Sequence, residues 1–279
     1  MKSKKKFKVS RIFQIWLPLI LFTLFILFPY YWMFVTSVKP DADIISKPVQ
    51  YWAANFTWEH YKDLFGYFNF LKYMGNSLII AVGTTVLSLV VSTLAAYSFA
   101  RYDFKGRKIL MCLFLSNNMF PTVLLMIPLY SIMSSLGLLY SHFGMVLAYA
   151  TFSIPFSVWL IQGFIRDVPF ELEEAALVDG CTRRGAFLRI FLPVLAPCLL
   201  AAGVYMFMQA WNEYTLASLM TNPASRTIPV ALSTLIGQLG VDWGMLCAGG
   251  IITCLPVIIM FFFAQKYLVA GMTAGAVKG

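Results

Sequence analysis

The chain has 279 residues, of which 60% are hydrophobic and 12% are charged, and its formal net charge is +9. The charged share is about half of that in soluble domains, so a soluble globule of this size would lack the polar groups to cover its surface. Because the basic residues flank apolar stretches and do not gather with stacking aromatics, the positive charge does not indicate a nucleic-acid partner.

Several long stretches of the chain contain no Asp, Glu, Lys or Arg, namely 12–38, 73–100, 109–165, 190–212 and 243–265. A helix needs roughly 20 apolar residues to cross the hydrocarbon core of a membrane, so four of these stretches predict one spanning helix each. The stretch 109–165 is long enough for two, and its polar residues between Ser134 and His142 predict the turn that joins them. The sequence therefore predicts an all-α membrane protein with six transmembrane helices.

The basic residues predict the orientation of the chain. Most Lys and Arg residues lie in the N-terminus, in the connections 101–108 and 166–189, and near the C-terminus, and fewer lie in the connections 39–72 and 213–242. Since Lys and Arg are enriched in cytoplasmic connections, both termini are predicted to be cytoplasmic.

The N-terminal segment, with a basic start and a following apolar run, has the order of charges found in a signal peptide. The apolar run is longer than that of a signal peptide and no small-residue cleavage site follows it, so we expect a retained first helix. The predicted organisation has four parts: a cytoplasmic basic N-terminus (1–11), a first helix with an outer loop (12–72), a transmembrane core (73–270) and a cytoplasmic tail (271–279).

The outer loop after the first helix is rich in aromatic residues, and its segment from Trp58 to Phe65 predicts one short surface helix. The loop is either a solvated segment on the membrane surface or a contact for an extracytoplasmic partner. The residues alone leave both interpretations open.

Small and polar residues inside the predicted spans indicate how the helices pack. The second span is rich in Ser, Thr, Gly and Ala, which let helices approach closely in lipid, so we expect it to be central in the bundle. The third and fourth spans hold Asn117, Asn118, Pro121 and Gln162. These groups either form hydrogen bonds between helices or line a polar translocation path.

The most informative connection is the inner loop 166–193, which starts with acidic residues. Asp167 is a capping residue type, Pro169 suits a first helical turn, and the acids that follow suit the positive end of a helix dipole. These acids are Glu171, Glu173 and Glu174.

In the same loop, Ala175 and Ala176 keep one helix face narrow, and Gly180 permits a left-handed stop. The loop therefore predicts a short helix of about three turns that inserts into a groove of another protein. The alternative is an amphipathic helix on the membrane surface, but such helices are usually basic because they face anionic lipid. The acidic start favours a protein groove that carries Arg or Lys.

The sequence contains no site for ATP hydrolysis. It has no GxxxxGK(S/T) segment and no Gly-Lys pair, so no P-loop cradles a triphosphate. Its two His residues and few acids form no metal or general-base cluster along the sequence. We expect a transport subunit that is not an enzyme and has no metal or cofactor of its own.

The residues Glu174-Ala175-Ala176, Gly180, Ile190 and Leu192-Pro193 have the spacing of the EAA loop, and the chain thereby resembles the permeases of binding-protein-dependent ABC importers. Further motifs resemble the carbohydrate branch of that family, in particular the smaller permease subunit of maltose-type importers. These motifs are Ala96–Arg101, Met119–Pro121, Ile127–Tyr130, Ile154–Phe156, Trp211–Glu213 and Gly271–Gly279. The resemblance runs from about residue 73 to the end of the chain.

The resemblance implies a type I ABC importer permease, located in a bacterial or archaeal plasma membrane, that carries a sugar by alternating access. The implied partners are a second, homologous permease in a heterodimer, two ATP-binding subunits, an extracytoplasmic substrate-binding protein and membrane lipid. ATP and magnesium would be bound by the ATP-binding subunits. An ABC permease for a non-sugar solute is the alternative. A secondary transporter is less favoured, because the uncharged stretches contain no ionisable coupling residue except His142.

The resemblance also assigns roles to individual residues. The ATPase-coupling residues are Glu173, Glu174, Ala175, Ala176, Asp179, Gly180, Ile190, Leu192 and Pro193. A second ATPase contact is assigned to the tail residues Gly275, Val277, Lys278 and Gly279. The predicted translocation path comprises Asn117, Asn118 and Pro121, from the residues themselves, together with Trp211, Asn212 and Glu213. For the last three the resemblance implies a contact with the substrate-binding protein or an outer gate, and the alternative is an interfacial anchor.

Overall fold

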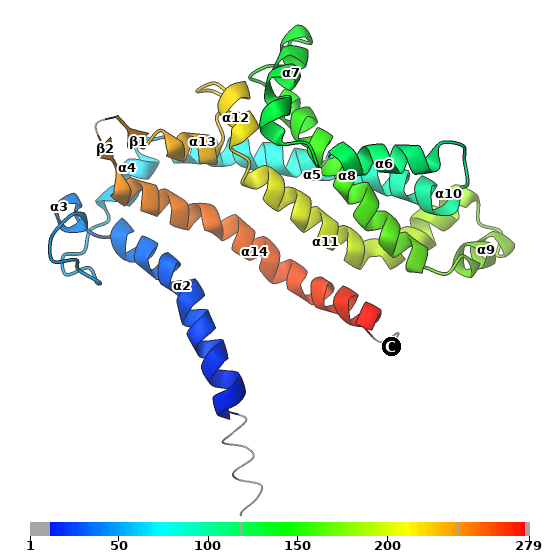
Figure 1. The fold of residues 1–279 in the computed structure, drawn as a ribbon, viewed down its shortest axis with the longest axis horizontal. Helices are drawn as coiled ribbons and strands as arrows, with labels where there is room; N and C mark the ends of the chain where they lie inside the picture. The colour runs from blue at the N-terminus through cyan, green and yellow to red at the C-terminus, as the bar shows by residue number, and fades with distance from the viewer. Residues whose placement is uncertain (1–11, 118, 239, 277–279) are drawn as a thin grey trace, which may run out of the picture. The chain divides into compact units, whose positions relative to one another are not determined.

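The structure is a computed structural model that describes residues 12–117, 119–238 and 240–276, and these ranges are mostly α-helical (Figure 1). The chain forms two compact units. Unit 1 comprises Met1–Phe70 and Leu232–Leu255, and unit 2 comprises Leu71–Ala231 and Pro256–Gly279.

The first half of the chain contains the π-helical turn η1 (Ile12–Trp16) and the helices α2 (Leu17–Ser37), α3 (Asp41–Ile44), α4 (Glu59–Phe65), α5 (Phe70–Arg101), α6 (Arg107–Asn117) and α7 (Thr122–Ser135). The second half contains α8 (His142–Asp167), α9 (Glu171–Val178), α10 (Arg183–Ala186), the π-helical turn η2 (Phe187–Phe191), α11 (Leu192–Trp211), α12 (Thr215–Met220), α13 (Ile228–Ser233) and α14 (Trp243–Ala276). A two-residue antiparallel pair, β1 (Ile236–Gly237) and β2 (Gly240–Val241), precedes α14.

Within the described ranges, five helices are long and apolar enough to cross a membrane, and a sixth span results if the pair α6 and α7 is counted as one. The third span is broken, because α6 and α7 differ in direction by 103°. Pro121 is the N-cap of α7 with an extended ψ of 127°, and a proline also disfavours the α region at the residue before it, so the helix cannot run through Phe120 into α7. The predicted turn between the third and fourth spans is confirmed between Ser135 and His142.

Unit 1 is formed by α2, α3, α4, the β pair and the first part of α14. The predicted surface helix after Trp58 is confirmed as α4, which buries His60 and Leu64. Gly244 is required beside His60, because a Cβ atom at this position would lie 2.1 Å from the imidazole Cε1. Most of the apolar side chains of α2 are exposed, as expected for a helix that faces lipid or another membrane subunit.

In unit 2, α8 packs against α6 and α11, with α9 and α10 at one end of α8 and α11 and with α12 at the other end (Figure 1). Helical spacing places Val158, Ile161 and Ile165 on one face of α8. This face packs in one buried cluster with Ala202 and Met206 of α11. Such packing, rather than exclusion from water, holds helices together in lipid.

The small residues of α5 face the interior of unit 2. The side chains of Thr84, Ser88 and Ser92 are fully buried, and the Ser92 hydroxyl donates to the Ile154 carbonyl of α8 at 3.3 Å. Within this chain, α8 is more buried than α5, and the central position of α5 in the bundle remains a prediction. About 56% of the most apolar stretch of α8 is buried, compared with 33% for that of α5, whose other face carries exposed residues such as Val86 and Val90.

Polar side chains at the start of α5 hold the connection between α12 and α13. The Asn76 amide donates to the carbonyls of Ala224 and Arg226 at 3.0 and 2.9 Å, and the Ile228 N–H donates to the Ser77 hydroxyl at 2.8 Å. His142 Nε2 lies 2.9 Å from Asn76 Oδ1 and joins the start of α8 to the same group. His142 therefore has a structural partner and is not placed as a lone ionisable group.

Candidate coupling loop and membrane cavity

The inner loop contains the expected short helix, α9, but its start differs from the prediction. Asp167 is the last residue of α8 and not the cap of α9, because Val168 is extended (ψ 121°) and breaks the helix there. The helix begins at Glu171 after Phe170, which offers no side-chain cap. α9 has 8 residues and is thus shorter than the predicted three turns.

The predicted stop at Gly180 is confirmed. Gly180 has φ +85°, a conformation that costs little only for glycine. The Cys181 N–H donates to the Ala176 carbonyl at 3.0 Å, and the Gly180 N–H donates to the Leu177 carbonyl at 3.1 Å. This pair of bonds is a Schellman motif, which satisfies the last carbonyls of α9.

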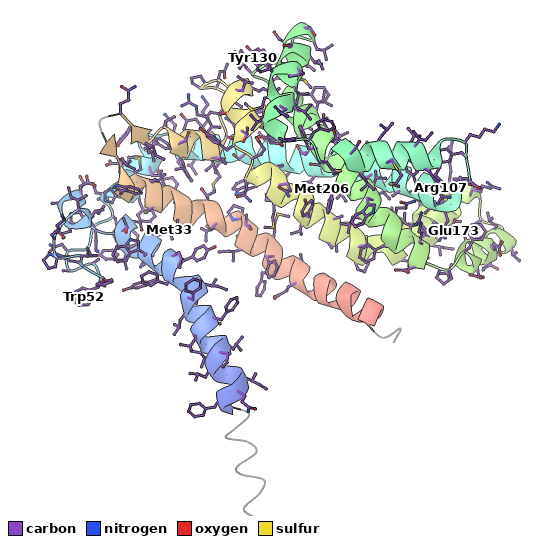
Figure 2. All side chains as sticks on the ribbon, viewed as in Figure 1. Met33, Trp52, Arg107, Tyr130, Glu173 and Met206 are labelled. Atoms are coloured by element: carbon purple, nitrogen blue, oxygen red, sulfur yellow. The ribbon has the colours of Figure 1, made fainter. Side chains whose placement is uncertain are left out.

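Glu173, which Figure 2 labels, is buried and holds α9 against the end of α5. Its carboxylate accepts hydrogen bonds from Arg101 Nε at 2.7 Å and from the Tyr97 hydroxyl at 2.6 Å. The Arg101 guanidinium also donates to the Val168 carbonyl at 2.9 Å and lies over the rings of Phe170 and Phe191. Both charges of this ion pair are buried and hydrogen-bonded, which is the arrangement in which a buried pair is tolerated.

The neighbouring acid, Glu174, points the other way. Glu174 and Ala175 are exposed, whereas Ala176 is buried at 2% exposure against the chain's own helices. Val178 is 87% exposed and, with Leu172 and Leu177, adds an apolar rim to this surface. The exposed face of α9 therefore combines an unburied carboxylate with a small residue and apolar side chains.

The other predicted coupling residues are placed around this helix. Asp179 is the exposed C-cap of α9. Ile190 lies in η2, which packs on α9, and Leu192 and Pro193 form the first turn of α11. Gly275 lies in α14, which continues to Ala276, while Val277, Lys278 and Gly279 lie outside the described residues.

A cavity of about 220 Å³ lies at the other end of unit 2, between α8, α11, α12 and the junction of α6 and α7. Two of the residues predicted for a translocation path, Asn117 and Glu213, line it. The Asn117 amide donates to the Thr151 carbonyl at 3.1 Å, so it also joins α6 to α8. The Glu213 carboxylate accepts from the N–H groups of Leu216 and Ala217, at 2.8 and 3.1 Å, and thereby caps α12.

Three further predicted path residues, Trp211, Asn212 and Pro121, are not among the described residues that line the cavity. Trp211 is buried and stacks on Phe207 with ring centroids 5.5 Å apart. The Asn212 amide donates to the Met208 carbonyl at the end of α11, and Pro121 is exposed before α7. Asn118 lies outside the described residues. Gln162 lies elsewhere in α8 and donates to the Phe99 carbonyl at 3.1 Å, which is an interhelical bond.

The cavity has lining residues that the sequence interpretation missed, among them Tyr149, Ser153, Phe156, Tyr205 and Gln209. The first three follow one another at helical spacing on α8, and the last two lie one turn apart on α11. The sequence signal that could have identified them is a face of polar and aromatic residues on two otherwise apolar spans.

A second grouping that the sequence did not reveal lies in unit 1. Asp41, His60 and Asp242 bring one ligand atom each within 4.8 Å of one another. Each of them also has a structural partner: His60 Nε2 lies 2.7 Å from the Lys39 carbonyl and 3.8 Å from an Asp41 carboxylate oxygen, and Asp242 accepts from the Met245 N–H at the start of α14. These contacts explain why the three side chains lie close together, so the group does not indicate a metal site.

Comparison with known proteins identifies the family. Residues 88–274 match the family described as binding-protein-dependent transport system inner membrane component. The diacetylchitobiose uptake system permease protein DasC of Streptomyces coelicolor is 38% identical over 269 residues, which cover 95% of this chain and 98% of that protein. The trehalose/maltose transport system permease protein MalG of Thermococcus litoralis is 34% identical over 264 residues, which cover 93% and 94%.

Among solved structures, a bacterial ABC transporter involved in the import of the acidic polysaccharide alginate contains a chain with the same fold. The TM-score is 0.77 at 22% sequence identity, and the match covers 96% of this chain and 98% of that one. The predicted resemblance to the permeases of sugar importers and the predicted helical fold are thus confirmed. The protein is a multi-pass protein of the plasma membrane. The chain belongs to the family of binding-protein-dependent transport system inner membrane components.

Proposed function

We propose that this chain is a permease subunit that carries a sugar or oligosaccharide into the cell by alternating access, driven by ATP hydrolysis on separate subunits. The observation that carries the proposal is the arrangement of α9. Its Glu173 side is locked to Arg101 and Tyr97, and its Glu174 side is exposed. A helix that is fixed to its own chain on one face and exposed on the other can bind a partner and transmit the partner's movement to that chain.

The proposed coupling works through rigid contacts. Glu174 would pair with an Arg or Lys in a groove of an ATP-binding subunit, while Ala175 leaves room for close approach. Movement of that groove would displace α9 together with the end of α5, because the buried Glu173–Arg101 pair joins them. The contact between η2 and α9 would pass the same movement to the start of α11, so that helices rotate as one body.

The remaining partners of the proposal are a second, homologous permease, two ATP-binding subunits and an extracytoplasmic sugar-binding protein. The family description names a binding protein, and the exposed apolar side chains of α2 provide a surface for lipid or for the second permease. ATP and magnesium would be bound on the ATP-binding subunits, since the sequence has no P-loop. A second ATPase contact is proposed for the tail residues Gly275, Val277, Lys278 and Gly279.

A sugar as the cargo is supported by the names of the relatives, which transport diacetylchitobiose and trehalose or maltose. A permease for a non-sugar solute is the remaining alternative. A secondary transporter is not favoured, because the intramembrane His142 is engaged with Asn76 at the end of the span.

The test is the variant Glu174→Lys in a complete complex reconstituted into lipid vesicles. The variant is expected to insert and assemble with its partner permease but to lose most substrate-stimulated ATPase activity, because a Lys would repel a basic groove. A matched control is Asp103→Lys, which adds the same charge at an exposed site in the connection between α5 and α6. ATPase stimulation of Glu174→Lys at the wild-type level would contradict the proposed coupling.

A further inference from the structure

The cavity of unit 2 contains a buried hydroxyl that has no hydrogen bond of good geometry in the described part of the chain. Tyr149 is 3% exposed, and its side chain lines the cavity. Its hydroxyl makes no hydrogen bond of good geometry to any residue that the structure describes, although the Glu213 carboxylate lies close enough to interact with it. Buried hydroxyls nearly always have a partner, so this one indicates a ligand or ordered water in the cavity.

The second polar group, Glu213, is held in a fixed position by the backbone of α12. Its two oxygens each accept one N–H, from Leu216 and Ala217, and a carboxylate has further lone pairs that remain for a ligand. Tyr149 and Glu213 thus place a donor and an anionic acceptor on one side of the same cavity. This pairing suits a ligand rich in hydroxyl groups, since each hydroxyl both donates and accepts.

Aromatic side chains form another part of the wall. The rings of Phe156 and Tyr205 lie 4.8 Å apart, and the Tyr205 hydroxyl accepts a hydrogen bond from Gln209 at 2.8 Å. The tyrosine ring is therefore held in place by a neighbour one helical turn away. Apolar walls with a few placed polar groups are typical of sites for small organic ligands.

The charge of the cavity limits the class of ligand. Its lining residues in the described part of the chain include Glu213 and no Lys or Arg. A ligand that carries a carboxylate would face the Glu213 charge without a compensating cation, and like charges at close range in a site of low dielectric repel strongly. The cavity is also smaller than the roughly 300–1,000 Å³ of sites that enclose a whole drug-sized ligand.

The geometry points to a sugar subsite in this permease subunit, in which one ring of a neutral saccharide binds with Tyr149 as donor and Glu213 as acceptor. This inference rests on the proposed function and adds to it the class of sugar and the direct participation of this subunit. The rest of an oligosaccharide would extend out of the cavity. An acidic polysaccharide, such as the cargo of the alginate importer, does not fit this subsite.

The experiment measures uptake of labelled saccharides by the full complex in lipid vesicles with its binding protein. The neutral probes are trehalose, maltotriose and diacetylchitobiose, and the acidic probe is trigalacturonate. Tyr149→Phe removes only the hydroxyl and is expected to lower the uptake rate of a neutral sugar about three- to tenfold, the effect of one lost hydrogen bond. Glu213→Gln is expected to lower it as well. Tyr30→Phe, an exposed position on α2, is the matched control and is expected to behave as wild type.

The outcomes separate the two proposals. Basal ATPase activity is expected to stay unchanged in the control Tyr30→Phe, because neither α9 nor the cavity is touched. If the wild type takes up a neutral sugar and Tyr149→Phe does so at the same rate, the subsite is rejected while the sugar-import proposal stands. Uptake of trigalacturonate by the wild type overturns the assignment to neutral sugars. Failure of the wild type to take up any of the sugars rejects the sugar-import proposal, and the subsite with it.

Discussion

At the scale of single residues, adjacent acids of α9 have opposite environments. Glu173 is buried at 8% exposure and bonded to Arg101 and Tyr97, whereas Glu174 is exposed. Because successive residues of a helix point about 100° apart, two neighbouring acids can face a protein core and a partner respectively. The sequence interpretation assigned both to the ATPase contact, and the structure turns one of them to the interior.

Replacing Glu173 by Ala is expected to lower the stability of the chain by about 3 kcal/mol, because Arg101 would be left as a buried charge without its partner. The measurement is the thermal unfolding of the purified permease in detergent. The same substitution at exposed Glu174 is the control and is expected to leave the unfolding temperature unchanged. Equal unfolding temperatures for both variants would show that the buried pair does not hold α9.

Gly180 allows a prediction about the end of α9. Gly180→Ala is expected to cost about 1 kcal/mol of stability, since a side chain at φ +85° is strained even where no described atom lies within 4 Å. Gly163→Ala is a matched control on α8, where the added methyl also meets open space but the backbone is helical. There the substitution is expected to stabilise by about 0.5–1 kcal/mol. Thermal unfolding shows whether each substitution raises or lowers the stability of the chain. A higher unfolding temperature for Gly180→Ala would contradict the assigned conformation.

At the scale of elements, small residues decide where helices touch. A Cβ atom at Gly83 of α5 would lie 2.9 Å from a Val146 methyl carbon of α8, so the two helices approach closely at this point. On another face of α5 the hydroxyl residues Thr84, Ser88 and Ser92 are buried, and branched residues such as Val86 and Val90 are exposed. Because its small residues are buried on one face and its large residues are exposed on the other, α5 can pack closely against other helices and also contact lipid.

Gly83→Leu is expected to destabilise the chain by about 1–3 kcal/mol, because the larger side chain must push α5 away from Val146. Val86→Leu adds a similar apolar group on the exposed side and is expected to have little effect. The unfolding temperatures of the two variants in detergent test this. A tolerated Gly83→Leu would mean that α5 and α8 do not pack closely at this residue.

At the scale of the whole molecule, the proposed coupling loop and the proposed sugar subsite lie apart from each other within unit 2. The coupling loop lies at one end of α8 and α11, and the cavity lies where these helices meet α12. α8 and α11 pack along a shared apolar cluster that includes Ile161 and Met206. A movement imposed on α9 would therefore reach the cavity through packed helices, which is the physical requirement for coupling ATP hydrolysis to transport.

The positions of most spans and the family were determined by the sequence alone. Lipid offers no hydrogen bonds to an open backbone, so an uncharged apolar stretch of about 20 residues has little alternative to a helix. The spacing from Glu174 to Pro193 predicted the permease family, and the comparison with known permeases confirmed it. The cytoplasmic location of both termini remains a prediction from the basic residues.

Only the tertiary structure decided which residues act together. Tyr149 and Glu213 are far apart in the sequence, and no local sequence pattern predicts that α8 and the start of α12 meet at one cavity. The same holds for Arg101 and Glu173, whose pairing depends on how the end of α5 meets α9. Hydrophobic patterning places a helix in the membrane, but the rotation of each helix is set by packing against its neighbours, and this rotation determines which of two adjacent acids is buried.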